Sequence, residues 1–316
     1  MPSVSVLLLT YNSDPAQVRR ALTAIAGQKE VALEVIISDD GSTKKDFSFL
    51  PDFMDRIGLQ QWKLLEHATN RGTVYSCLSA AEAATGEYAF TTSPGDFLFD
   101  EYVLRDFYRF AKEHNSVCCF GNPVYYGCEE GTPKQSLQYG QPLRPQHYEK
   151  DVPAAYGKTA FFAGDWVVGA CYFRRLPEFR ECLQAIAGKV VYAEDTPTTM
   201  FLMAQGNRLY YYDRNMVWYE YGTGISTGGS SKWDRLVRED IHSGYRLLKE
   251  QFPRDPYIDY AHRHALETSD LRRSAGNVLR HLDIMLRLRL LRRAPKKEVS
   301  CADKDWERLA ELLKIQ

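Results

Sequence analysis

The chain has 316 residues, enough for one large α/β domain and a smaller C-terminal part. Its 40 basic and 41 acidic residues give a formal net charge of -1, which excludes a molecule-wide positive field for nucleic acid. Hydrophobic residues make up 44% and charged residues 26%, which is typical of a folded globular protein and excludes general disorder.

The cysteines and the apolar runs favour an intracellular protein. Seven cysteines without a CxxC pair indicate neither a disulfide set nor a zinc site. The first ten residues lack the basic region and the long apolar run of a signal peptide. No apolar run approaches the ~20 residues that span a bilayer. We therefore expect a cytoplasmic location, with a membrane surface as the only membrane contact.

The chain begins with a predicted β-α-β unit. Residues 4–10 are almost wholly apolar and β-rich, like a strand covered on both faces. A turn at 11–15 precedes helical spacing of apolar residues over 18–25. A second apolar run at 33–37 ends in Ser-Asp-Asp-Gly-Ser. Strand, helix and strand in this order indicate an α/β fold with a mainly parallel sheet.

The alternation continues along the chain. The next elements expected are a strand at 62–65, a helix at 73–84, a strand at 88–91, a long irregular loop at 121–151, a strand at 169–173, a helix at 196–204, a strand at 208–212 and a glycine-rich segment at 221–229. After Trp233 the pattern is helical, with breaks at 253–256 and at Pro295. We divide the chain into an α/β domain, 1–230, and a C-terminal helical region, 231–316.

Polar side chains follow several of the predicted strands. Tyr11, Asp39 with Asp40, and Asp96 each come after a different strand. The carboxyl ends of parallel strands form the ligand-binding edge of an open sheet. Carboxylates there suit a hard divalent cation that also binds phosphate oxygens, or a base that deprotonates a hydroxyl.

Five short motifs carry a family resemblance. In chain order they are Val4-Ser5-Val6 with Thr10-Tyr11-Asn12, Ser38-Asp39-Asp40-Gly41-Ser42, Asn70-Arg71-Gly72, Ser93-Pro94-Gly95-Asp96, and Glu194-Asp195. With them the chain resembles the family 2 glycosyltransferases, which have the GT-A fold, over residues 3–225. The resemblance implies an inverting enzyme that moves a sugar from a nucleotide-diphosphate donor, with a UDP-sugar favoured, to a hydroxyl of a saccharide or lipid-linked glycan. Bacterial polysaccharide or glycan assembly is the implied role.

The resemblance also implies the donor-binding residues. Tyr11 would lie near the nucleotide base, Asp40 with Asp39 would hydrogen-bond the base, and Arg71 would help to hold the nucleotide. The implied set is completed by Thr10, Asn12, Ser93 and Asp96. Two aspartates before a glycine are also typical of a tight turn, and Arg71 as a solvated side chain stays open as an alternative.

The metal motif departs from the family pattern. An Asp-x-Asp motif is usual, whereas Ser93 and Gly95 stand at two of its acidic positions and leave Asp96. One carboxylate with diphosphate oxygens and water still provides ligands for Mn2+ or Mg2+. We expect Asp96 to bind this metal; the alternative is a loop cap.

The Glu194-Asp195 pair matches the catalytic pair of the family, with Asp195 as the general base. Asp195 before Thr-Pro is also a good start for a helix, and both roles are compatible. Asp165 and Trp166 lie where the family places acceptor-side residues. A core position for Trp166 is the alternative.

The C-terminal region is locally basic. Residues 261–297 contain ten Lys or Arg and three Asp or Glu, and residues 278–293 alternate leucines with arginines. Such a helix fits an anionic membrane surface. Packing against the catalytic domain, or against a second copy in a homo-oligomer, is an equal alternative.

Two other classes of function remain as alternatives. The reduced metal motif would suit a catalytically inactive sugar-nucleotide-binding protein, and the basic tail would suit a membrane-tethering protein on a GT-A scaffold. A nicotinamide dehydrogenase is excluded, because the first strand-to-helix turn, 9–15, contains no glycine.

Overall fold

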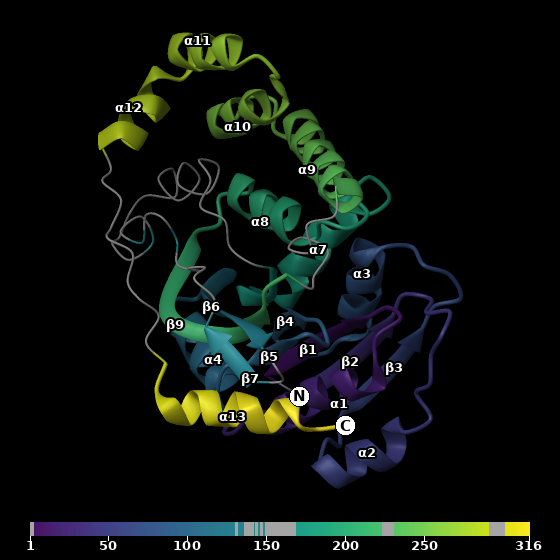
Figure 1. Cartoon of the computed structure of the whole chain (residues 1–316). Helices are drawn as coiled ribbons and strands as arrows, with labels where there is room; N and C mark the ends of the chain where they lie inside the picture. Colours follow the sequence, from purple (N-terminus) through teal and green to yellow (C-terminus); the bar gives the residue numbers. More distant parts are fainter. Residues whose placement is uncertain are drawn as a thin grey trace.

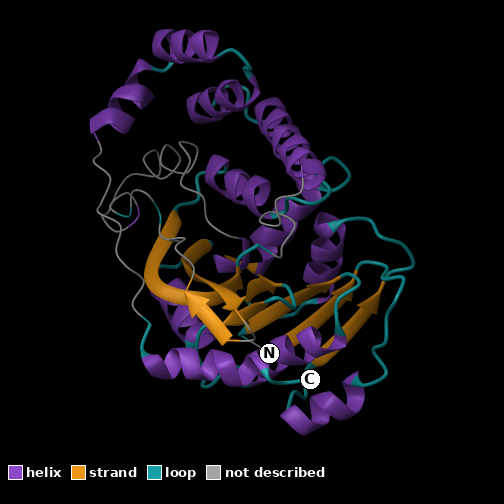
Figure 2. Cartoon of the chain, viewed as in Figure 1, coloured by secondary structure: helices purple, strands orange, loops and turns teal. Residues whose placement is uncertain are grey.

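The computed structural model describes residues 3–129, 132–135, 142, 145, 148, 169–222, 231–290 and 301–316. A mixed sheet lies at the centre, with the strand order β3-β2-β1-β4-β8-β6-β9-β5, and β7 pairs with β6 outside this path. Helices cover both faces of the sheet, and a group of C-terminal helices extends beyond one end of it (Figures 1 and 2). The α/β class and the C-terminal helical region predicted from the sequence are confirmed.

The strands are β1 Val4–Thr10, β2 Leu33–Asp39, β3 Trp62–Glu66, β4 Tyr88–Thr92, β5 Asp96–Leu98, β6 Cys118–Glu129, β7 Thr132–Gln135, β8 Tyr172–Arg175 and β9 Leu209–Glu220. The helices are α1 Pro15–Ala26, α2 Leu50–Ile57, α3 Thr73–Ala83, α4 Val103–Glu113, the 3-10 turn η1 Gly169–Cys171, α7 Leu176–Ile186, α8 Asp195–Ala204, α9 Ser231–Gln251, α10 Pro256–Leu266, α11 Asp270–Arg280, α12 Leu282–Leu290 and α13 Asp303–Leu313.

The first half of the sheet is parallel, as predicted. β3, β2, β1 and β4 lie side by side, with Thr10 at the end of β1 in register with Asp39 at the end of β2. Side chains of β1 alternate between two hydrophobic layers: Val6 and Leu8 enter the larger core, and Leu7 packs into a smaller one with residues of α3 and α7. The apolar run at 4–10 therefore reflects burial on both faces.

The second half of the sheet corrects two predictions. β6 continues through Glu129 and pairs with β9, so the expected irregular loop at 121–151 is wrong for its first part. The polar Asn122 lies inside this strand because its side chain donates to Asp213 Oδ1 (3.0 Å) and accepts from Tyr211 Oη (2.9 Å). The expected strand at 169–173 is also shorter, because it begins as the 3-10 turn η1 and becomes β8 only at Tyr172.

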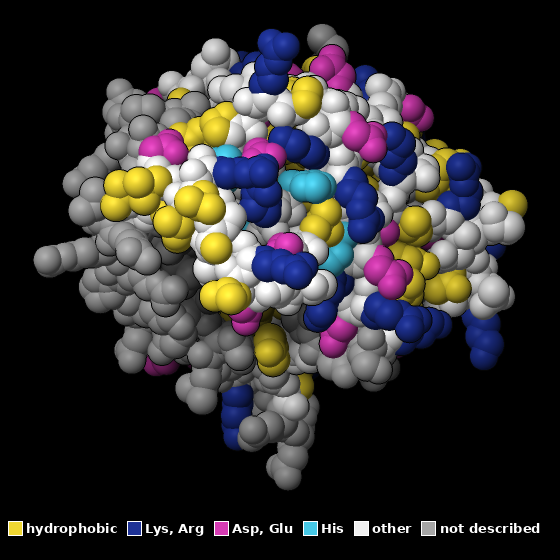
Figure 3. Space-filling model, turned by 90° about the horizontal axis from the view of Figure 1, so that it is seen from above, with side chains coloured by type: hydrophobic (Ala, Val, Ile, Leu, Met, Phe, Trp, Pro, Cys, Tyr) yellow, Lys and Arg dark blue, Asp and Glu magenta, His cyan; other side chains and the backbone are white. Residues whose placement is uncertain are grey.

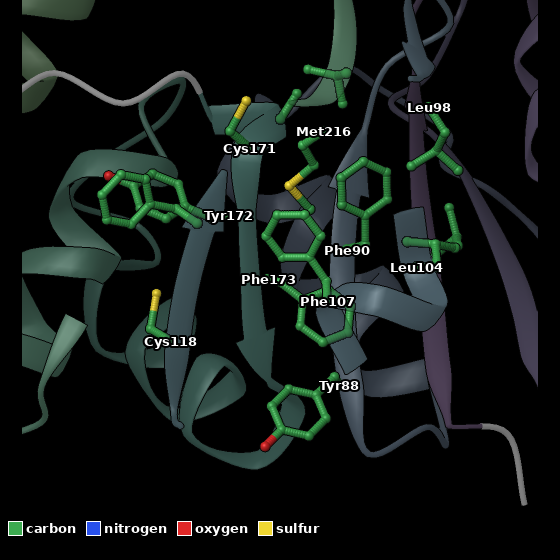
Figure 4. Close-up of a cluster of buried hydrophobic side chains, with 14 of the residues drawn as sticks. Tyr88, Phe90, Leu98, Leu104, Phe107, Cys118, Cys171, Tyr172, Phe173 and Met216 are labelled. Carbon is green, nitrogen blue, oxygen red and sulfur yellow. The ribbon is translucent and has the colours of Figure 1, made fainter. Parts of the chain in front are cut away.

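Aromatic rings join the two halves of the sheet. Tyr88 of β4 stacks on Phe173 of β8 at 5.1 Å between ring centroids, and Phe107 of α4 approaches Phe173 at 6.2 Å. Figure 4 shows these rings together with Phe90 and Met216 in one buried cluster. All three rings of the stack are at most 1% exposed, so each contributes about 1.5–3 kcal/mol of burial free energy.

The C-terminal helices contain more breaks than the prolines predict. The single helix expected over 278–293 is interrupted at His281, which is buried with Nε2 2.9 Å from Asp259 Oδ2. Asp259 also pairs with Lys249 of α9 (2.6 Å) and Arg263 of α10 (2.7 Å). This cluster joins three helices. The helix breaks at His281 because the imidazole pairs there with the Asp259 carboxylate, a long-range contact that composition does not indicate.

The last helix, α13, returns to the sheet layer. Its Trp306 contacts Trp218 of β9 at 4.7 Å between ring centroids, and its Leu309 is fully buried. Arg20 of α1 donates from Nε to the carbonyl oxygen of Ile315 (2.8 Å). In Figure 1, α13 runs along the same side of the sheet as α1. Within the described residues, no helix has both the length and the apolar character needed to cross a bilayer.

Candidate functional site

The ends of β1 and β2 form one hydrogen-bonded unit around Asp39. Thr10 Oγ1 donates to Asp39 Oδ1 (3.2 Å), the backbone N–H of Ser42 donates to Oδ2 (2.9 Å), and the Ser42 hydroxyl donates to Oδ1. Asp39 has no solvent exposure. Asn12, in the left-handed region at φ 47°, accepts from the backbone N–H of Thr43 (2.9 Å). Thr10, Asn12 and Asp39 therefore hold the turn in shape.

Asp40 connects this turn to the start of α3. Its Oδ1 accepts from the backbone N–H of Arg71 (2.9 Å) and its Oδ2 from that of Gly72 (2.8 Å). Burial raises the pKa of Asp40, and the two N–H donors act against that rise. Each oxygen keeps a lone pair, so contact with a nucleotide base stays a prediction for Asp40.

Two of the predicted donor-binding side chains lie exposed beside this unit. Tyr11 is 49% exposed, and the Arg71 side chain lies over the ring of Tyr75 at 3.4 Å. The ring of His67 contacts that of Tyr75 in an edge arrangement, with 5.0 Å between the ring centroids. A cation over an aromatic face loses freedom but keeps its charge, so Arg71 presents a fixed positive group near the ends of β2 and β3.

Asp96 lies at the start of β5, near the end of β4. Ser93 Oγ donates to Asp96 Oδ2 (2.8 Å). Burial raises the pKa of Asp96 to about 6, against the hydrogen bond from Ser93, and the charge of Glu220 raises it further. Ser93 thus contacts the candidate metal ligand, and its own contact with the donor stays a prediction.

Asp96 would bind a divalent cation only if a bound diphosphate and water supplied the remaining ligands. Within the described ranges, no group of three or more His, Cys, Asp or Glu side chains could hold a metal. Asp96 offers the Oδ1 that Ser93 leaves free, and its desolvated charge would be stabilised by a cation. A single carboxylate fits Mn2+ or Mg2+ that takes its remaining ligands from diphosphate and water.

Glu194 and Asp195 stand at the first turn of α8. Glu194 is the N-cap residue and Asp195 the first helical residue, with Oδ1 accepting from the backbone N–H of Thr196 (2.6 Å). Desolvation raises the pKa of both carboxyl groups, and the charge of Asp195 raises that of Glu194 further. The helix N-terminus favours the ionised form. Asp195 therefore both starts the helix and presents a carboxyl of raised proton affinity, as a base requires.

The turn η1 connects this pair to Asp96. A β-carbon on Gly169 would stand 3.1 Å from Asp195 Oδ2. At the other end of the same turn, the Cys171 thiol is close enough to Asp96 for that charge to raise its pKa, after the larger effect of burial. The candidate base and the candidate metal ligand thus lie on either side of one three-residue turn.

Arg174 lies within electrostatic reach of the carboxylate pair and was not predicted from the sequence. It is 1% exposed, and its Nε and Nη2 find no hydrogen-bond partner among the residues that the structure describes. Its positive charge lowers the pKa of Glu194 and Asp195, against their desolvation. Two of the four residues of β8 are arginines, Arg174 and Arg175, so nothing in the sequence singles out Arg174 as the buried one, although a buried arginine is rare. The predicted acceptor-side residues Asp165 and Trp166 lie outside the described residues.

Comparison with known proteins identifies the family of the chain. Residues 5–173 match the model of a protein family described as Glycosyl transferase family 2. A Haemophilus influenzae protein described as an uncharacterized glycosyltransferase is 24% identical over 129 residues, which are 41% of this chain and 50% of that protein. The match therefore spans about half the length of this relative.

Solved structures share the fold over most of the chain. S. aureus TarS 1-349 in complex with UDP has a TM-score of 0.56 and 17% identity, and the match covers 90% of this chain and 78% of the 1-349 chain. The mannosyltransferase PcManGT from Pyrobaculum calidifontis, in complex with GDP-Man and Mn2+, has a TM-score of 0.53 and 16% identity, covering 99% and 85% of the two chains. At these identities the likeness supports the GT-A fold.

Proposed function

Because the chain belongs to glycosyl transferase family 2, we propose that it moves a hexose-type sugar, with inversion, from a nucleotide-diphosphate donor to an acceptor hydroxyl. The observation that carries this proposal is the turn η1, which has Asp195 against one end and Asp96 within electrostatic reach of the other. A base and a diphosphate-side carboxylate that approach the same short turn suit a reaction in which the acceptor attacks as the nucleotide leaves.

Asp195 is the proposed general base. Its raised proton affinity suits removal of a proton from the acceptor hydroxyl as that oxygen attacks the anomeric carbon. The bond from the anomeric carbon to the diphosphate breaks in the same displacement, which inverts the configuration. Arg174 would moderate the charge at this position, because it lowers the pKa of Asp195 and of Glu194 against their desolvation.

The donor would bind across the ends of β1 to β4. We propose that Tyr11 and Arg71 contact the nucleotide, within a loop built by Thr10, Asn12, Asp39 and Asp40. A uridine donor is favoured, in line with TarS, which has been solved with UDP and with UDP-GlcNAc. Asp96 would hold Mn2+ or Mg2+, which would neutralise charge on the diphosphate. The product would be a bacterial polysaccharide or another glycan, made in the cytoplasm.

The test is nucleotide release from UDP-glucose, UDP-GlcNAc and GDP-mannose, with and without Mn2+, in the presence of simple saccharide acceptors. We expect one donor to be consumed, Asp195→Asn to abolish turnover while keeping nucleotide affinity, and Asp96→Ala to lose the response to metal. Glu181→Gln, an exposed acid on α7, is the matched control. Nucleotide binding without turnover in the wild type would indicate the sugar-nucleotide-binding alternative instead.

We also propose contact with an anionic membrane surface through α11 and α12. Five large apolar side chains there are exposed, among them Leu279 at 85% and Leu271 at 81%. The apolar set, called the α11–α12 surface below, is Leu271, Val278, Leu279, Leu282 and Leu286. Their exposure favours a partner outside the chain over packing on the catalytic domain. Figure 3 views this end of the molecule and shows hydrophobic side chains beside Lys and Arg side chains.

Charge favours lipid as the partner of the α11–α12 surface. Arg272 and Arg280 are exposed on α11, and the sequence from 282 to 297 contains six Lys or Arg against one acidic residue. Apolar side chains beside basic ones suit the boundary between acyl chains and anionic headgroups. Such contact would bring the enzyme to a lipid-linked acceptor.

A further inference from the structure

One carboxylate of the C-terminal helices reaches back into the candidate site. Asp240 of α9 is 8% exposed, and its Oδ2 accepts from three consecutive backbone N–H groups, those of Val191, Tyr192 and Ala193, at 2.5 to 3.3 Å. Successive N–H groups that converge on one anionic oxygen make strong, charge-assisted hydrogen bonds. Asp240 therefore fixes the backbone of the segment Val191–Ala193, called the strap below.

The strap leads directly into Glu194 and Asp195, and its other side faces the nucleotide half of the site. Val74 donates its backbone N–H to the carbonyl oxygen of Val191 (2.9 Å). Gly72 packs so closely on the strap that a β-carbon there would stand 2.3 Å from Val191 Cγ1. Gly72 is also the residue whose N–H binds Asp40. The strap thus lies between the Asp40 turn and α9.

A second contact of α9 lies on the other side of the catalytic pair. Gly244 is four residues after Asp240, and so on the same face of the helix. A β-carbon on Gly244 would stand 2.9 Å from Pro197 Cγ in the first turn of α8. α9 therefore contacts the chain both before Glu194, through Asp240, and after Asp195, through Gly244. Two points on one rigid helix fix the segment between them.

We propose that Asp240 is a positioning residue for sugar transfer: by holding the strap, it sets the place of the Asp195 carboxyl relative to the donor bound beside Asp40 and Arg71. This inference rests on the proposed function. On this proposal α9 helps to position the catalytic residues, although it lies in the predicted helical region and outside the motifs of the family.

The test compares Asp240→Asn with Glu239→Gln. Glu239 is the neighbouring acid on α9, its side chain is 65% exposed, and its ion pair with Arg235 is 3.9 Å long, so it is the matched control. Asn keeps the shape of Asp240 but removes the charge that binds three amides. We expect kcat to fall about 100-fold, as for a displacement of a reacting group by about 1 Å, while the Kd for UDP changes less than twofold. Hydrogen exchange of the strap amides should accelerate in Asp240→Asn and stay unchanged in Glu239→Gln.

Three results would overturn the inference: kcat of Asp240→Asn within twofold of wild type, a loss of UDP affinity as large as the loss of kcat, or strap amides that exchange as in wild type. The second result would indicate general loss of structure. Failure of the proposed function gives a different pattern, because wild type would then consume no donor. Hydrogen exchange would still decide in that case whether Asp240 restrains the strap.

Discussion

Gly169 lies against the carboxyl group of Asp195: a β-carbon added at position 169 would stand 3.1 Å from Asp195 Oδ2. A real β-carbon rarely comes this close to another atom, so the carboxyl would have to move by a few tenths of an ångström. A base must remain within hydrogen-bond reach of the proton that it removes. The absence of a side chain at Gly169 therefore allows the Asp195 carboxyl group to take its observed position.

Gly169→Ala should lower kcat about tenfold, because the displaced Asp195 carboxyl meets the acceptor hydroxyl at a poorer distance. The measurement is steady-state kinetics with the donor that the wild type consumes. Gly127→Ala is the control, because a β-carbon at that position meets no atom within 4 Å. Equal kcat in Gly169→Ala and wild type would show that catalysis does not depend on the position of the Asp195 carboxyl group beside Gly169.

Asp96→Asn should stabilise the protein near neutral pH and leave it unchanged near pH 4. Burial raises the pKa of Asp96 from its usual 3.8 to about 6, so the folded state holds this proton more tightly than the unfolded chain does. The associated stability is present below about pH 4 and is lost as the pH rises through about 6. The variant avoids this loss, on the order of 2 kcal/mol at pH 7.5.

Urea unfolding of wild type and Asp96→Asn at both pH values measures this difference. Asp52→Asn, on the exposed side of α2, should change neither value. Mn2+ with UDP should stabilise wild type more than Asp96→Asn. A pH-independent difference between the two proteins would contradict the raised pKa of Asp96.

Much of the parallel half of the sheet could be predicted from the sequence, because β1, β2 and β4 are buried on both faces and so read as apolar runs. β6 could not, because Asn122 and Pro123 disfavour a strand locally and only pairing with β9, far along the chain, compensates. The motif residues at the strand ends could also be recognised, because each motif is a short continuous segment of the sequence. Arg174, Gly169 and Asp240 act through contacts that no short segment contains.

Leu279→Glu should weaken binding to vesicles that contain phosphatidylglycerol about tenfold or more, because it replaces an apolar side chain that would enter the lipid. Co-sedimentation with these vesicles and with neutral phosphatidylcholine measures the effect, and added salt should also weaken binding. Gln251→Glu, an equal change of charge at an exposed position on α9, is the control. If the wild type does not bind vesicles but self-associates, and Leu279→Glu prevents the self-association, the α11–α12 surface is a contact between two copies of the chain.

Leu309→Ala should lower the free energy of unfolding by about 2–5 kcal/mol, since it leaves a cavity between α13 and the core. Leu279→Ala should change it by less than about 0.5 kcal/mol, because that leucine is 85% exposed. Urea unfolding without lipid compares the pair. A similar small effect of both changes would mean that α13 does not pack as described.

The hydrogen bond between Arg20 and Ile315 joins residues 295 positions apart. During synthesis on the ribosome, at roughly 5–20 residues per second, α1 and the β strands beside it emerge long before α13 exists to cover them. Trp218, which is 1% exposed in the complete fold, therefore lacks its contact with Trp306 until α13 has been made. Until then the nascent chain carries an uncovered apolar face.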